Sequence, residues 1–225
     1  MSNLPTVTKN ILIINVLCFL SMIVGRRYGI DLNDILGLHF ILADDFSPYQ
    51  LVTYMFMHAN FEHIFFNMFA VWMFGRTLES VWGPRRFLTF YLICGIGAGL
   101  AQELVQMVDY AVNLSHYDAV NTLTGVIPMK EYLNFFNTVG ASGAVYAILM
   151  GFGVLYPNAE LFIIPFPFPI KAKYFVTFYI LIELYMGIFS TADGVAHFAH
   201  LGGMIFGYIM IKYWKRKDGY GGFGY

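Results

Sequence analysis

The chain has 225 residues, of which 58% are hydrophobic and 12% are charged, and its formal net charge at pH 7 is −1. Soluble domains carry about 25% charged residues. This composition, with a mean hydropathy of +0.62, therefore excludes an ordinary soluble domain and predicts an all-α polytopic membrane protein in a lipid bilayer. No basic patch in the sequence points to nucleic acid as a partner.

Six apolar runs are candidates for membrane-spanning helices, which need about 20 mostly apolar residues. They cover residues 10–28, 57–81, 86–108, 139–156, 172–190 and 195–213. The first run lacks a small-residue cleavage site and ends in two arginines, so it is predicted to be a retained helix and not a signal peptide. We expect a short tail at 1–9, a six-helix membrane domain over 10–217 and a flexible tail at 218–225.

Polar residues and prolines predict the nature of the longest connecting segments. Residues 29–56 contain several aspartates between short apolar patches and are expected to form a structured loop at the membrane surface. Residues 109–138 are polar and are expected to form an irregular loop outside the bilayer. Residues 157–171 contain prolines, which lack the N–H that a helix needs, so no continuous helix is expected there.

The lysines and arginines predict the orientation, because cytoplasmic segments of membrane proteins carry an excess of these residues. With the N-terminus inside, the cytoplasmic segments hold Lys9, Arg76, Arg85, Arg86, Lys171, Lys173, Lys212, Lys215, Arg216 and Lys217. The outer segments hold only Arg26, Arg27 and Lys130 of the 13 basic residues in the chain. Both termini are therefore predicted to lie in the cytoplasm.

This orientation brings three polar groups of residues to the same depth. The second, fourth and sixth predicted helices all run from outside to inside, so His63 with Asn67, Ser142, and His200 lie near the outer ends of three helices. The fourth helix measures only about 20 Å beyond Ser142, whereas the hydrocarbon core is about 30 Å thick. Ser142 is therefore expected below the outer surface, at the bottom of a water-filled depression.

Ser142 is the candidate nucleophile of this group. It lies between Gly140 and Gly143, where a polar loop turns into an apolar helix. A serine hydroxyl becomes a good nucleophile when a neighbouring base takes its proton. The alternative is that the small residues only form a face for close helix packing, and the two interpretations are compatible.

His200 is the candidate base, since histidine is suited to proton transfer near neutral pH. It shares a helix face with Gly203 and Gly207, at positions i, i+3 and i+7, which a neighbouring helix can approach closely. An ionisable residue inside a membrane span is expensive and is a functional candidate by default. His197 lies nearer the outer surface and is interpreted as a hydrogen-bonded histidine at the edge of a loop.

His63 and Asn67 are candidate donors to a developing negative charge. Their i, i+4 spacing places them on one face of the second helix, and an imidazole N–H and an amide aimed at one point can stabilise an oxyanion. The alternative is that they are hydrogen-bonding contacts between helices. His58, at the membrane edge, is interpreted as a structural residue that holds the preceding loop.

No acidic partner for His200 is obvious in the sequence. Tyr146, one turn after Ser142, is either a core aromatic residue or a ring that packs on the imidazole of His200. Asp193 is a further candidate for the acid, although it is expected in a loop. Glu183 lies in the middle of the fifth predicted span and is either a polar contact between helices or part of a water path.

Taken in order, these residues resemble the rhomboid family of intramembrane serine proteases. The matching residues are His58, His63 and Asn67 on the second helix, Gly140, Ser142, Gly143 and Tyr146 on the fourth, and His200, Gly203 and Gly207 on the sixth. The resemblance covers nearly the whole chain. One departure is in the first loop, which reads Ser-Pro-Tyr-Gln-Leu at 47–51 where many members carry Trp-Arg.

The resemblance implies a dyad of Ser142 and His200 without an aspartate. His63, Asn67 and the backbone N–H of Ser142 would form the oxyanion hole, and Tyr146 would stack on His200. The glycines of the two helices would bring the dyad together.

The expected activity is hydrolysis of a peptide bond within or next to the transmembrane segment of single-span membrane proteins, without cofactor or metal. The expected location is a bacterial cytoplasmic membrane, with the active site facing outside. Two alternatives stay open. A transporter could bind a metal ion through His58, His63, His197 and His200, although no Asp or Glu is expected at the outer ends of these helices. A non-catalytic protein of the same fold could instead bind other membrane proteins.

Overall fold

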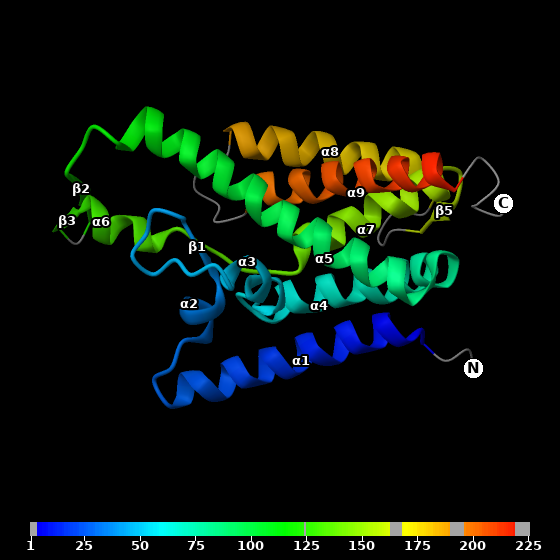
Figure 1. The fold of residues 1–225 in the computed structure, drawn as a ribbon, viewed down its shortest axis with the longest axis horizontal. Coiled ribbons are helices and arrows are strands. Elements are labelled where there is room, and N and C mark those ends of the chain that lie inside the picture. Colours follow the sequence, from blue (N-terminus) through cyan, green and yellow to red (C-terminus); the bar gives the residue numbers. More distant parts are fainter. Residues whose placement is uncertain (1–3, 124, 163–167, 190–195, 219–225) are drawn as a thin grey trace.

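The computed structural model describes residues 4–123, 125–162, 168–189 and 196–218. Its long helices run roughly alongside one another, and the start of α1 and the end of α9 lie at the same end of the bundle (Figure 1). The main helices are α1 (Thr6–Arg27), α4 (Phe61–Ala70), α5 (Arg76–Asp109), α7 (Ser142–Leu155), α8 (Ala172–Phe189) and α9 (His197–Lys217). The expected helical membrane bundle is confirmed.

Three stretches of the described chain are long and apolar enough to cross a membrane, namely Thr6–Arg27, Phe61–Leu114 and Ala172–Phe189. The second stretch bends back on itself at Gly83, which has φ 78° and ψ 165° and precedes Pro84. Glycine adopts a positive φ without the steric penalty that other residues meet. The bend produces two antiparallel limbs (Figure 1), which correspond to the separate spans predicted at 57–81 and 86–108.

The two long loops lie at the end of the bundle opposite the start of α1 and the end of α9 (Figure 1). The first loop contains α2 (Leu32–Leu36), β1 (Leu38–His39), α3 (Gln50–Thr53) and η1 (Tyr54–Phe56). The second contains η3 (Tyr110–Leu114), β2 (Ala119–Thr122), β3 (Gly125–Pro128), α6 (Met129–Tyr132), η4 (Leu133–Phe135) and β4 (Asn137–Thr138). The prediction that 109–138 is irregular was therefore wrong, because β2 and β3 form an antiparallel hairpin.

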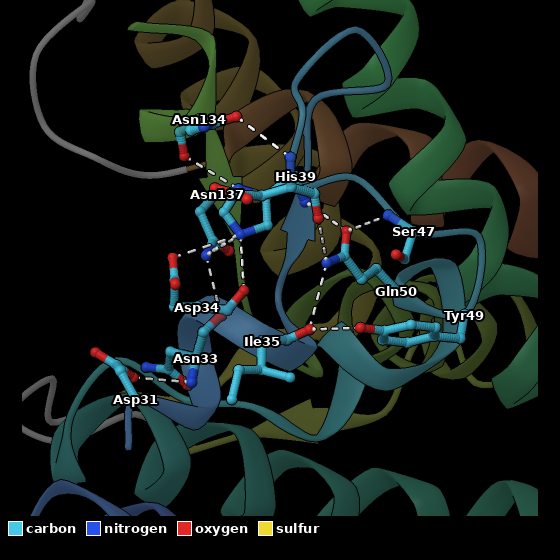
Figure 2. Close-up of polar contacts among 11 residues, drawn as sticks. Asp31, Asn33, Asp34, Ile35, His39, Ser47, Tyr49, Gln50, Asn134 and Asn137 are labelled. Atoms are coloured by element: carbon cyan, nitrogen blue, oxygen red, sulfur yellow. Dashed lines mark hydrogen bonds and ion pairs between the residues drawn. The ribbon is translucent and has the colours of Figure 1, made fainter. Parts of the chain in front are cut away.

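Strands β1 and β4 join the two loops, with Leu38 opposite Thr138 and His39 opposite Asn137. The buried ring of His39 supports this pairing: its Nδ1 lies 3.0 Å from the carbonyl oxygen of Asn134, and its Nε2 lies 2.7 Å from that of Asp34 (Figure 2). β4 leads directly into the loop before α7. The two loops therefore form one cap that fixes where α7 begins.

Gln50 organises the first loop from within. Its Oε1 accepts hydrogen bonds from the backbone N–H of His39 and of Ser47, and its Nε2 donates to the carbonyl oxygens of Ile35 and Asp45 (Figure 2). The side chain is buried, so all these groups are satisfied away from water. Gln50 lies in the segment that departs from the family's Trp-Arg, and this network holds the loop here.

The short helix α7 packs against α5 and α9. A Cβ atom built on Gly203 of α9 would lie 1.9 Å from the carbonyl oxygen of Gly143 in α7. Any side chain at Gly203 would thus push the two helices apart. α7 ends at Leu155, just before Pro157, and the next described segments are β5 (Glu160–Leu161) and β6 (Ile170–Lys171), as the prolines predicted.

Two carboxylates stabilise the end of the bundle where α1 begins and α9 ends. Glu79 accepts hydrogen bonds from the backbone N–H of Val7 and of Thr8 and from the hydroxyl of Thr8, at 2.7 to 2.9 Å. The first N–H groups of a helix have no partner inside the helix, so Glu79 caps α1 from a distance. α1 consequently begins at Thr6, inside the expected tail. Asp218 accepts hydrogen bonds at 2.5 and 2.9 Å from Arg86.

α5 and α9 extend beyond their predicted limits, and α8 begins at the predicted residue 172. α5 runs to Asp109 and α9 runs to Lys217, each beyond the predicted end of its span. The predicted ends at residues 190 and 195 lie outside the described residues, as does the part of the expected C-terminal tail from 219 to 225.

Candidate active site

Ser142 is the first residue of α7, and the backbone before it sets its position. Gly140 has φ +134°, a conformation that other residues rarely adopt, and its N–H donates to the carbonyl oxygen of Tyr54 at 2.9 Å. This bond fixes the turn against η1. The first N–H groups of α7, that of Ser142 included, have no acceptor inside the helix.

His200 lies one turn into α9 and faces Ser142. Its Nε2 is 2.8 Å from the Oγ of Ser142, a hydrogen-bonding distance. His200 is only 8% exposed. The ring of Tyr146 stacks on its imidazole, with the centroids 4.2 Å apart and the planes 6° from parallel. His200, not His197, therefore makes the contact with the serine.

His63 and Asn67 lie on α4, whose first turn is capped by Asn60 through a 2.8 Å hydrogen bond to the backbone N–H of His63. The Nδ1 of His63 is 3.4 Å from the backbone N–H of Ala59. A ring nitrogen that accepts this bond carries no proton, so the tautomer assigned to neutral His63 has its proton on Nε2.

The Nε2 side of His63 is next to the serine. A Cβ built on Gly140 would lie 2.7 Å from the Nε2 of His63 and 3.4 Å from the Oγ of Ser142. Asn67 donates one amide hydrogen to the carbonyl oxygen of His63 at 2.7 Å, which leaves a second amide hydrogen available. The structure thus brings His63 and Asn67 to the site of Ser142.

His58 lies behind this group. Its ring centroid is 5.1 Å from that of His63, in an edge-to-face arrangement, and its carbonyl oxygen accepts a 3.3 Å hydrogen bond from Asn33 in the first loop. His58 is fully buried. It therefore connects the first loop to the start of α4 and does not border the serine.

A cavity of about 1180 Å³ surrounds these side chains. His63 and Asn67 line it from α4, Ser142 and Tyr146 from α7, and His200 from α9. Aromatic residues of α4 and η2 (Val71–Gly75) also line it, as do Phe175 and Tyr179 of α8. The cavity is large enough to hold water and several residues of a peptide, and it extends between α4 and α8.

Glu183 also belongs to this site, and its position there was not predicted from the sequence. Its Oε2 is 2.6 Å from the Nδ1 of His197 and 3.0 Å from the Nδ1 of His200, and its Oε1 accepts a hydrogen bond from the hydroxyl of Tyr146. The sequence showed no obvious acidic partner for His200, and in the structure Glu183 of α8 lies beside it. Asp193 lies outside the described residues. A carboxylate inside a span was the available signal, but hydropathy does not indicate which helix it faces.

Among the residues that the structure describes, Glu183, His197 and His200 have donor atoms within 4.8 Å of one another, close enough to be considered as metal ligands. Two ligands on a tetrahedral zinc ion with bonds of about 2.0–2.1 Å lie about 3.3 Å apart. The 2.6 and 3.0 Å contacts of Glu183 with the two histidines are shorter. The donor atoms contact one another directly, an arrangement typical of ion pairs and not of ligands spread around an ion.

The fold and this site define an α-helical integral membrane protein with a serine–histidine pair inside a cavity of its membrane domain. The sequence profile of the Rhomboid domain matches residues 45–217. The chain belongs to the rhomboid family.

Curated relatives agree with this assignment. The chain is 30% identical over 156 residues to Rhomboid protease AarA of Providencia stuartii, an alignment that covers 68% of this chain and 51% of that protein. It is 27% identical over 133 residues to Rhomboid protein 1, mitochondrial, of Saccharomyces cerevisiae, covering 58% and 32%. Rhomboid protease GluP of Bacillus subtilis is 26% identical over 114 residues, covering 50% and 22%. The chain spans about half or less of the length of these relatives.

Proposed function

We propose that this chain is an intramembrane serine protease that hydrolyses a peptide bond in or next to a transmembrane segment. The observation that carries the proposal is the 2.8 Å contact between the Oγ of Ser142 and the Nε2 of His200 inside the cavity. Membership in the rhomboid family, whose named relatives include proteases, supports it. The whole reaction uses side chains and backbone of the described chain, with no cofactor or metal.

In the proposed reaction, Ser142 attacks the carbonyl carbon of the scissile bond while the Nε2 of His200 accepts its proton. The resulting oxyanion is stabilised by the backbone N–H of Ser142, the Nε2–H of His63 and the free amide hydrogen of Asn67. His200 then donates its proton to the leaving amine, which departs with the C-terminal part of the substrate. Water in the cavity, activated by His200, hydrolyses the acyl-enzyme and regenerates the serine.

Tyr146 is assigned a positioning role in this reaction. Its ring lies flat on the imidazole of His200, which restricts rotation of the base out of the plane that faces Ser142. Gly143, Gly203 and Gly207 allow the close approach of α7 and α9, and Gly140 leaves room for the ring of His63. His58 supports the position of His63 from behind.

The proposed substrates are single-span membrane proteins, entering laterally between α4 and α8. The position of the cavity between these helices supports this route. A helical peptide bond is shielded by its hydrogen bonds, so the substrate must unwind near the cut. The proposed location is a bacterial cytoplasmic membrane, with both termini in the cytoplasm and the cavity opening outward, which the lysine and arginine distribution supports.

The test compares wild type with Ser142→Ala and His200→Ala, each purified and reconstituted in lipid. Cleavage of a model single-span substrate and labelling by a fluorophosphonate probe are measured, with and without a chelator. We expect wild type to cleave and label, both variants to lose cleavage and labelling, and the chelator to change nothing. Cleavage by Ser142→Ala would refute the nucleophile assignment. A folded wild type that neither cleaves nor labels, against a panel of substrates, would favour a binding protein.

A further inference from the structure

We infer that Glu183 completes a Ser142–His200–Glu183 triad, as the residue that orients and electrostatically supports the base. This inference rests on the proposed function and goes beyond the two-residue dyad that family resemblance implies. Three facts carry it: the contacts of the carboxylate, the side chains that hold the carboxylate in place, and the lack of a hydrogen-bonded partner for Nδ1 of His200 among the residues that the structure describes.

The carboxylate lies on the opposite side of the imidazole from the serine. Nε2 of His200 faces Ser142 at 2.8 Å, and Nδ1 faces Oε2 of Glu183 at 3.0 Å. If Nδ1 carries the proton, Nε2 has the free lone pair that a general base needs. A carboxylate at this distance favours that tautomer and also favours the imidazolium that forms when the serine attacks.

The far nitrogen of His200 needs such a partner. Nδ1 is buried and has no well-aligned hydrogen bond among the described residues, and the carboxylate of Glu183 lies 3.0 Å from it. The contact becomes an ion pair when His200 accepts the proton of Ser142. Glu183 is itself 6% exposed. In a buried site the charge is poorly screened by water, so its effect on a neighbouring imidazolium is larger than at a surface.

The carboxylate is held in place by two further contacts. His197 contacts Oε2 at 2.6 Å, and the hydroxyl of Tyr146 donates to Oε1. The same Tyr146 ring stacks on His200. One tyrosine therefore positions both the acid and the base, and the carboxylate cannot turn away without breaking these contacts.

A glycine next to Glu183 allows α8 to approach α9 closely. A Cβ on Gly187, one turn after Glu183, would lie 3.2 Å from the ring of Phe198 and 3.3 Å from the Cβ of His197. This small residue allows α8 to come close enough for a glutamate to reach the histidines of α9.

The experiment measures kcat and KM for cleavage of a model single-span substrate, and the rate of fluorophosphonate labelling, in Glu183→Gln, Glu183→Asp and Glu183→Met. Gln keeps the shape and removes the charge, whereas Asp keeps the charge on a shorter side chain. We expect Gln and Met to lower kcat at least about 100-fold with KM within about twofold of wild type, as removal of a triad acid does. The labelling rate is expected to fall in parallel, and Asp to recover at least about tenfold over Gln.

Glu103→Gln is the matched control. Glu103 is equally buried, at 6% exposed, and its Oε2 accepts a hydrogen bond from the backbone N–H of Ile41 in the first loop. Glu103 is not among the residues that line the cavity. An amide oxygen can accept the same bond, so we expect kcat within about twofold of wild type. A loss as large as that of Glu183→Gln would attribute the effect to removing any buried carboxylate and would overturn the inference.

Each other result of this experiment also supports or overturns the role of Glu183 in a triad. Wild-type kcat and labelling in Glu183→Gln overturn the triad while leaving the Ser142 and His200 variants to test the dyad. Activity of Asp no higher than that of Gln, with both folded, shows that the charge is not what matters. Loss of activity with a chelator and recovery with Zn²⁺ would assign the group to a metal ion. If Gln does not fold, Met, an apolar residue of similar size suited to the bilayer, gives the same test.

Discussion

The close contact between α7 and α9 predicts a large effect of one methyl group, Gly203→Ala. The added Cβ would lie 1.9 Å from the carbonyl oxygen and 2.7 Å from the carbonyl carbon of Gly143. Both atoms are backbone, so no side chain can rotate out of the way. A carbon and a carbonyl oxygen approach to about 3.3 Å at the closest, so α9 must move by about 1.4 Å. The 2.8 Å contact of His200 with Ser142 would then exceed hydrogen-bonding distance.

We expect Gly203→Ala to lower kcat about 100-fold, which corresponds to about 2.7 kcal/mol, and to lower stability by about 1–3 kcal/mol through overpacking. Substrate cleavage, fluorophosphonate labelling and the thermal unfolding midpoint measure these effects in lipid. Gly207→Ala is the graded comparison: its Cβ would lie 3.1 Å from that of Ala147, a contact that a few tenths of an ångström relieve, so its loss should be much smaller. Wild-type turnover in Gly203→Ala would refute the reasoning.

Three further predictions concern other parts of the chain. His63→Ala should lower kcat about 100-fold with KM little changed, because one oxyanion donor is removed; an unchanged kcat in cleavage assays would contradict this. Glu79→Ala should lower the unfolding free energy by about 2–4 kcal/mol, because the first N–H groups of α1 lose a charged acceptor; an unchanged midpoint on thermal unfolding would exclude it. Burial lowers the pKa of His58, which precedes the span Phe61–Leu114, from 6.5 to about 3. The folded state therefore binds fewer protons, and this histidine should lower the free energy of unfolding as the pH drops below 6.5, by up to about 1.4 kcal/mol per pH unit. Unfolding measured from pH 4 to 8 should show a smaller slope in His58→Gln than in wild type, and an equal slope would contradict this.

The helical architecture could be predicted because each long helix is an apolar run, and the breaks between them are marked by glycine and proline. Gly83 and Pro84 separate two limbs of one continuous apolar stretch, and Pro157 follows the end of α7. These signals are local. The signal that sets the start of α1 is distant in the sequence, because Glu79, 71 positions away from Thr8, supplies the acceptors that extend the helix.

The loops could not be predicted from periodicity. Strands β1 and β4 contain two residues each, too few for an alternating pattern to be recognised. Their pairing depends on the ring of His39, which contacts the carbonyl oxygen of Asn134, 95 positions away in the sequence. Side-chain chemistry alone does not identify such partners.

The candidate site, too, was predicted in part from the sequence. The ordered pattern of Ser142, His200, His63 and Asn67 was predicted from the sequence and from the family resemblance, and the structure brings these residues to one cavity. The position of Glu183 was not predicted. Its helix is apolar on all sides, and a hydrophobic run fixes neither the rotation of α8 about its axis nor its neighbour.

The proposed nucleophile and base come from α7 and α9, 58 positions apart along the chain, and α9 follows every other described helix. During synthesis Ser142 is translated 58 residues before His200. The serine has no base at that stage, and Glu183 has no histidine of α9 to support. The proposed hydrolytic activity therefore begins only after α9 has inserted and packed, so a half-made chain on the ribosome is chemically inert toward its neighbours in the bilayer.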